Sequence, residues 1–205
     1  MAPQIRTAVD FYKRHPISAQ IILTKFEAAR GTLDGLRPDE LFPHDQDHYG
    51  GTPANDALAK CAHIGSGTNV VDVPDLALAL SEAHRVLRPG GRIAFTDWIA
   101  HKPLSAADEK LLWDGMAAAT LINIDRHVEL LRDAGFEIEA IEDETDRWAI
   151  ILAERLRVYQ KLRGEAEQAD APAGHDDFYK SYVLFVSLVQ QKIMGSARFA
   201  AVKPA

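Results

Sequence analysis

Apolar residues at helical spacing predict most of the helices of this chain. After Pro74, the residues Leu76, Leu80, Ala83 and Leu87 recur every three or four positions, so they line one face of a helix. Spacing and capping residues predict further helices at 19–30 after Ser18, 53–63 after Thr52, 106–121 after Ser105, 126–134 after Asp125, 146–163 and 176–194.

Short runs of apolar and β-branched residues predict four strands, at 69–73, 92–98, 136–143 and 197–203. The helix that starts near Leu76, the turn "RPGG" and the strand 92–98 follow one another, which makes an α/β unit. Residues 34–53 are rich in Pro, Gly and Asp and have no periodicity, and a loop of this length in a compact domain is usually functional. The pattern therefore predicts an α/β fold with one long loop.

Length, charge and cysteine content limit the partners of the protein. The 205 residues are 47% apolar and suffice for one buried core, so we expect a single domain, 1–205. A net charge of -7 disfavours binding to nucleic acid and to anionic membranes, which leaves small molecules as the expected partners. Cys61 is the only cysteine, which fits a reducing compartment, and no apolar run is long enough to span a bilayer. We expect a cytoplasmic protein.

Four segments together point to one enzyme family. They are LFPHDQDHYGG (41–51), EAHRVLRPGGRIAFTDW (82–98), LLRDAGFEIEAIED (130–143) and ARFAAVKP (197–204). The chain resembles class I S-adenosylmethionine-dependent methyltransferases, most closely the small-molecule N-methyltransferases of the sarcosine/dimethylglycine type. The second segment is similar to the fifth strand of that family and its lead-in helix, and the last two are similar to an edge strand and the final strand.

The resemblance implies a fold and its subdivisions. The expected fold class is α/β, with an incomplete Rossmann-like methyltransferase sheet, an N-terminal helical lid and C-terminal helices. Residues 1–52 would form the N-terminal helix and lid loop, and 53–205 the α/β core with a helical insertion at 145–195.

The chain departs from this family after Val73. A family member would continue from VVDV into a Gly-x-Gly-x-Gly turn and then through a second, third and fourth strand, whereas here Pro74 follows directly. Either one strand stands in for both the first and the fourth, or residues are missing between Val73 and Pro74. The first alternative leaves a half-sheet with a long exposed edge, which is costly unless another chain pairs with it. We favour missing residues or such a pairing, and the pairing predicts a homodimer through the exposed edge.

The resemblance also implies the cofactor and the residues that bind it. The cofactor is S-adenosylmethionine, Tyr49 packs on its sulfonium, and Gly50 and Gly51 allow the chain to approach it closely. An aromatic face attracts a sulfonium or ammonium cation through cation–π attraction. Asp72, at the end of the first strand, is expected beside the same ligand.

The substrate is expected at Asp97 and Trp98, which end the strand 92–98. Ligands of open α/β sheets bind outside the carboxyl ends of the strands. If the substrate is an amine, Asp97 pairs with its cation and Trp98 forms an aromatic wall. The structural alternative makes Asp97 a cap and Trp98 a core aromatic residue.

The segment HDQDHYGG also holds four potential metal ligands, His44, Asp45, Asp47 and His48. No HExxH or cysteine framework accompanies them, so we expect no metal site. A solvated turn is the structural alternative to the lid. Trp113, Trp148 and Met116 are interpreted as packing residues, and His101 and His127 as surface or internally satisfied histidines.

The implied reaction is an in-line displacement of the sulfonium methyl group by an amine lone pair. An ammonium substrate must first lose its proton, and His48 is the hypothetical base. A non-catalytic remnant of the fold that acts as an oligomerisation or partner-binding module is the alternative from another class. A dinucleotide oxidoreductase is weaker, because it needs the same glycine-rich turn.

Overall fold

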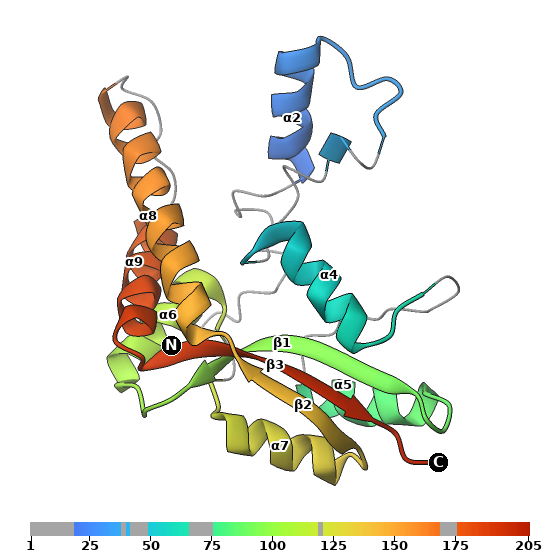
Figure 1. Cartoon of the computed structure of the whole chain (residues 1–205). Coiled ribbons are helices and arrows are strands. Elements are labelled where there is room, and N and C mark those ends of the chain that lie inside the picture. Colours follow the sequence, from blue (N-terminus) through green and yellow to red (C-terminus); the bar gives the residue numbers. More distant parts are fainter. Residues whose placement is uncertain (1–18, 38–39, 42–48, 66–75, 119–120, 169–175) are drawn as a thin grey trace, which may run out of the picture.

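The three strands that the structure describes are arranged in an order that differs from their order in the sequence. The computed structural model describes residues 19–37, 40–41, 49–65, 76–118, 121–168 and 176–205. Its strands are β1 (Arg92–Ala100), β2 (Glu137–Asp143) and β3 (Met194–Val202). The order is β1-β3-β2, and β3 is antiparallel to both neighbours, so the last strand of the chain lies in the middle of the sheet (Figure 1). The strand predicted at 69–73 lies outside the described residues.

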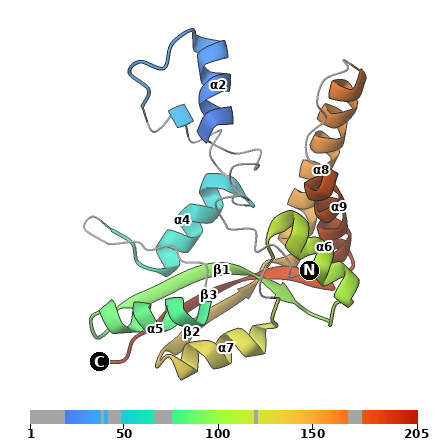
Figure 2. The same ribbon diagram turned by 180° about the vertical axis from the view of Figure 1, so that it is seen from behind.

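Helices lie on both faces of this sheet. α5 (Leu76–Val86) and α7 (Ile124–Asp133) cover one face, and α4 (Gly51–Cys61) lies over the other (Figures 1 and 2). At the carboxyl end of β1 a helical bundle consists of α6 (Ala106–Met116), α8 (Thr145–Gln168) and α9 (Asp176–Gln190), and α2 (Ala19–Arg30) stands away from the sheet. The mixed α/β fold predicted from the pattern is confirmed.

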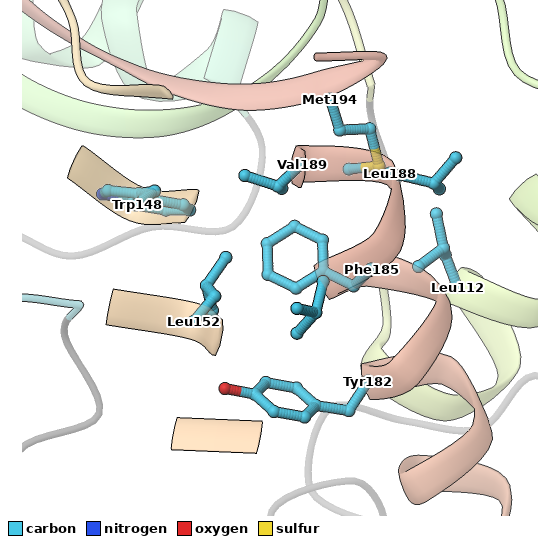
Figure 3. Close-up of a cluster of buried hydrophobic side chains, with 9 residues drawn as sticks. Leu112, Trp148, Leu152, Tyr182, Phe185, Leu188, Val189 and Met194 are labelled. Atoms are coloured by element: carbon cyan, nitrogen blue, oxygen red, sulfur yellow. The ribbon is translucent and has the colours of Figure 1, made fainter. Parts of the chain in front are cut away.

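Two apolar cores lie on opposite faces of β3. Its residues are buried from Met194 to Ala201, as expected of a central strand covered on both faces. The first core lies between the sheet and helices α5 and α7, and comprises Leu80, Ile99, Leu131, Phe136, Ala197, Phe199 and Ala201. The second core joins α6, α8 and α9 (Figure 3) and comprises Leu112, Trp148, Leu152, Tyr182, Phe185, Val186, Leu188, Val189 and Met194.

Several helix ends differ from the prediction, among them those of α8 (168 instead of 163) and α9 (190 instead of 194), and three others have local reasons. Asn123, not Asp125, caps α7, because the Asn123 Oδ1 accepts the backbone N–H of Arg126 at 2.8 Å. The cap of α4 is Gly50 rather than Thr52, with φ 100° in the left-handed region. α6 stops at Met116 instead of continuing to 121, because Ala117 adopts φ 55°.

The two edges of the described sheet differ in character. β2 carries acidic residues along its length and has a bulge between Ile138 and Ala140, two features that disfavour pairing with another chain. On the outer side of β1, the part of the chain that the structure describes adds a single parallel bridge between Ile99 and Ile122. β1 is therefore the candidate edge for the predicted pairing with a second chain. That pairing stays a prediction. No helix among the described residues has the length and apolar character needed to cross a bilayer.

Ser105 caps α6 as predicted, and its contact with Asp108 gives a testable consequence. The Ser105 Oγ accepts the Asp108 backbone N–H at 3.1 Å and donates to the Asp108 carboxylate at 2.8 Å. Ser105→Ala leaves that helical N–H without its partner, so we expect the free energy of unfolding in urea to fall by about 1 kcal/mol. Ser105→Thr keeps the hydroxyl and should lose less; equal losses in the two variants would contradict the capping role.

Candidate functional site

Four aromatic rings from four segments meet near the carboxyl end of β1. Trp98 of β1 stacks on Phe185 of α9, with ring centroids 4.6 Å apart. Trp148 of α8 lies edge-on to Phe185 at 6.4 Å, and these two rings sit on facing helices in Figure 3. Tyr49, just before α4, lies edge-on to Trp148 at 4.5 Å and 6.0 Å from Phe185. We call Tyr49, Trp98, Trp148 and Phe185 the aromatic cluster.

The two glycines after Tyr49 have conformations that favour glycine. Gly50 has φ 100° and Gly51 has φ 57°. A Cβ on Gly50 would lie 3.1 Å from the Ala54 Cβ and 3.4 Å from the Arg147 Nη2, so the missing side chain lets α8 approach the chain here. The predicted lid residues Tyr49, Gly50 and Gly51 thus lie near Trp98. The Phe185 ring contacts both the Tyr49 ring and the Trp98 ring.

Two arginines of α8 flank this part of the loop. The Arg155 guanidinium lies over the Tyr49 ring, 4.8 Å from its centroid, which is a cation–π contact. Arg147 lies against Gly50 and also contacts the Glu144 carboxylate at 3.5 Å. Two guanidinium groups therefore lie beside Tyr49 and Gly50, and one of them is paired with a carboxylate.

Asp97 lies on the other face of the sheet from Trp98. In the register of the sheet, Trp98 is opposite Ser196 and Asp97 is opposite Ala197. Neighbouring residues of a strand point to opposite faces, so Trp98 joins the aromatic cluster while Asp97 faces α7. The two predicted substrate residues are adjacent in sequence but not in the same layer of the fold.

His127 of α7 is the partner of Asp97, and the sequence interpretation missed this pair. Its Nε2 lies 3.2 Å from the Asp97 Oδ2, while its Nδ1 lies 2.9 Å from the Asn123 carbonyl oxygen. The His127 side chain is 0% exposed and stacks on Phe199 at 4.7 Å, whereas the Asp97 side chain is 38% exposed. The signal in the sequence was the position of His127 four residues before Leu131, on the buried side of its helix.

Two buried polar atoms near the aromatic cluster have no hydrogen-bond partner within the described part of the chain. They are the Trp148 Nε1 and the Ser196 Oγ, in side chains that are 5% and 0% exposed. In Figure 3 the nitrogen end of the Trp148 ring is turned away from Phe185. Such atoms are uncommon in folded proteins and are candidates for contact with a bound molecule.

Other expectations had mixed outcomes. Trp148 packs in the second core as predicted, but Trp113 is 50% exposed because it lies on the outer side of α6. His101, for which no partner was predicted, has its Nε2 2.9 Å from the Thr145 Oγ1.

Burial raises the pKa of the Tyr159 phenol, which packs edge-on against Phe178.

Three parts of the predicted site lie outside the described residues. They are the hypothetical base His48, the cofactor residue Asp72, and the junction between Val73 and Pro74. The potential metal ligands His44, Asp45 and Asp47 lie there as well.

Comparisons with solved structures identify the fold. The chain superposes on phosphoethanolamine N-methyltransferase 2 of Haemonchus contortus in complex with S-adenosyl-L-methionine, with a TM-score of 0.51 and 27% identity over 65% of this chain and 31% of that one. The chain has a class I methyltransferase fold. A sarcosine dimethylglycine methyltransferase of Galdieria sulphuraria gives a TM-score of 0.53 at 14% identity, over 64% of this chain and 48% of that one.

Curated relatives are methyltransferases too. Phosphoethanolamine N-methyltransferase 3 of Arabidopsis thaliana is 25% identical over 63% of this chain, and 27-O-demethylrifamycin SV methyltransferase of Amycolatopsis mediterranei is 30% identical over 47%. The chain spans 27% and 36% of the lengths of these two relatives. No family model matches the chain. The methyltransferase fold predicted from the four sequence segments is confirmed.

Proposed function

We propose that this protein takes part in methyl transfer from S-adenosylmethionine to the nitrogen of a small amine. The observation that carries the proposal is the aromatic cluster, which joins the lid residue Tyr49 to Trp98 near the carboxyl end of β1 in a methyltransferase fold. Ligands of such sheets bind outside the carboxyl ends of the strands. Relatives with N-methyltransferase in their names support the nitrogen acceptor.

The residues present fit a sulfonium ligand. The ring of Tyr49 already carries one cation, Arg155, at 4.8 Å, and a sulfonium needs the same kind of aromatic face. Gly50 lets the backbone come close to α8 beside Tyr49, and the Trp148 Nε1 is a buried donor without a partner among the described residues. Tyr49, Gly50 and Gly51 would hold the cofactor, together with Asp72 from the segment outside the described residues. When bound, S-adenosylmethionine supplies an activated methyl group.

The task of the protein is to align the substrate and keep water away. Trp98, stacked on Phe185, offers a rigid aromatic wall for a methylated ammonium group. Asp97 points to the α7 side of this strand end, opposite to Trp98, and stays the proposed counter-ion; His127 together with the Trp98 backbone N–H fixes its two oxygens. Orientation of this kind is the main catalytic contribution open to a protein whose cofactor carries the reactive group. His48 remains our proposed base for the substrate proton.

Ligand binding tests the proposal directly. S-adenosylmethionine at 100 times its dissociation constant should stabilise the folded state by about 2.7 kcal/mol and raise the melting temperature by about 5–10 °C. Tyr49→Ala should weaken binding about 3- to 30-fold in calorimetry, because it removes the cation–π face.

Tyr179→Ala is the matched control, since Arg163 lies over Tyr179 at 4.7 Å but Tyr179 is not part of the aromatic cluster. The control should bind S-adenosylmethionine like the wild type. A melting temperature that does not respond to S-adenosylmethionine would sink the proposal and favour the partner-binding module.

A further inference from the structure

We propose that two copies of this chain associate through the outer edge of β1, which pairs antiparallel with the β1 of the second copy about a two-fold axis at Ala94. The pairing joins the sheets of the two copies into one continuous sheet. The inference concerns assembly, so it does not depend on the proposed methyl transfer.

Backbone hydrogen bonds near the two ends of β1 show which of its residues point away from β3. The Lys203 N–H donates to the Gly91 carbonyl oxygen at 2.8 Å, so the Gly91 backbone faces β3. The Ala100 N–H donates instead to the Ile122 carbonyl oxygen at 3.0 Å, on the outer side of the strand. Hydrogen-bonding groups alternate between the two sides along a strand. The even-numbered residues of β1 therefore direct their N–H and C=O groups outward.

Part of this outer edge is already occupied. Besides the bond of Ala100, the outward N–H of Trp98 donates to the Asp97 Oδ1 at 2.8 Å. Within the described residues, three outward residues have no backbone hydrogen bond on this side, namely Arg92, Ala94 and Thr96. Backbone hydrogen bonds run in the plane of a sheet, whereas α4 and α5 lie over its faces (Figures 1 and 2). The amino-terminal half of the β1 edge can thus accept another strand.

Symmetry and the open backbone groups select one register. In a two-fold interface, residue i is opposite residue j and j is opposite i. An axis at Ala94 places Ala94 opposite its own copy and Arg92 opposite Thr96, so all the open residues are paired, with about six backbone hydrogen bonds. An axis at Thr96 would instead place Ala94 opposite Trp98, whose N–H is already bonded.

The side chains also suit this register. It places Ile93 opposite Phe95 of the second copy, in the type of antiparallel pair whose side chains lie closest. Both residues are only partly buried against the first core, so the pairing buries more of their apolar surface. On the other face Ala94 meets a second alanine, and Arg92 meets the uncharged Thr96, so the paired residues bring no like charges together. The open edge is therefore self-complementary, which favours a second copy over an unrelated strand.

The molar mass in solution tests the association on the wild-type protein. Light scattering during gel filtration should give a value near twice the chain mass of 22.6 kDa, and dilution should lower it because association follows mass action. A mass equal to that of one chain at every concentration would overturn the inference.

A cysteine variant tests the register. In a protein with Cys61→Ser, which removes the native thiol, Ala94→Cys places two thiols directly opposite one another across the two-fold axis. The Cα atoms of such a hydrogen-bonded pair are about 5.5 Å apart, a separation that a disulfide can bridge. Mild oxidation should therefore convert most of this variant into a covalent dimer on a non-reducing gel.

Thr96→Cys in the same background is the matched control. Position 96 lies on the same edge and is exposed, but its two copies would be four residues apart along the paired strands, about 14 Å, which is too far for a disulfide. Circular dichroism checks that both variants are folded. Equal cross-linking of the two variants would overturn the register at Ala94. A dimer in which neither variant forms a disulfide would overturn the pairing through β1.

Discussion

Gly115→Ala should destabilise the protein by about 3 kcal/mol, because it forces a methyl group into the contact between α6 and α9. An ideal Cβ at Gly115 lies 1.9 Å from the Ser181 Oγ and 2.6 Å from the Asp177 carbonyl oxygen. Ser181 cannot turn away without loss, since its hydroxyl contacts the Leu111 carbonyl oxygen at 2.7 Å and that of Asp177 at 2.8 Å. Urea unfolding followed by circular dichroism measures the loss.

Gly164→Ala is the matched control for this prediction. Gly164 also lies inside a helix, α8, but nothing lies within 4 Å of its Cβ position. Alanine there should raise the free energy of unfolding by about 0.5–1 kcal/mol, the difference in helix propensity between the two residues. A loss in Gly115→Ala no larger than about 1 kcal/mol would show that the two helices can separate at little cost.

Glu144→Gln should cost about 3 kcal/mol, since it leaves the buried Arg198 without its buried counter-ion. The Arg198 and Glu144 side chains are 7% and 5% exposed and form a direct hydrogen bond. The Arg198 Nε has no partner within the described residues, and the other carboxylate that bonds the guanidinium, Glu142, is exposed to solvent. Thermal unfolding followed by calorimetry measures the change.

The control for this pair is Glu142→Gln. Glu142 also bonds the Arg198 guanidinium, at 2.8 Å, but its side chain is 62% exposed. Water screens such a pair, so the substitution should change the stability by no more than about 1 kcal/mol. Similar losses in the two variants would mean that burial of Glu144 does not decide the strength of the interaction.

Local signals in the sequence predicted most of the elements and several of their ends. α2 spans the predicted residues 19–30 and is followed by Gly31 with φ 79°, and the box of Ser105 and Asp108 begins α6. These features depend on residues within one helical turn, so the sequence carries them directly. Competition between equivalent local signals explains the errors, as when Asn123 rather than Asp125 caps α7.

The relation of Asp97 to Trp98 shows how far local reasoning about the site extends. The period of two along a strand implies that adjacent residues face opposite ways, a signal that the expectation of Asp97 and Trp98 at one substrate site did not use. Their partners could not be read from the strand at all, because His127 is 30 residues from Asp97 and Phe185 comes from a helix late in the chain. Pairing over such distances depends on which helix covers which face of the sheet.

The sequence by itself determined the α/β class, the positions of helices and strands, and the resemblance to methyltransferases, because hydrophobic periodicity and capping act over a few residues. Only the tertiary structure decided that β3 lies between β1 and β2, and that Tyr49, Trp98, Trp148 and Phe185 form one cluster beside the arginines of α8. Those contacts join residues far apart in the chain. They form because burial of the apolar faces compensates the entropy lost when distant segments are brought together.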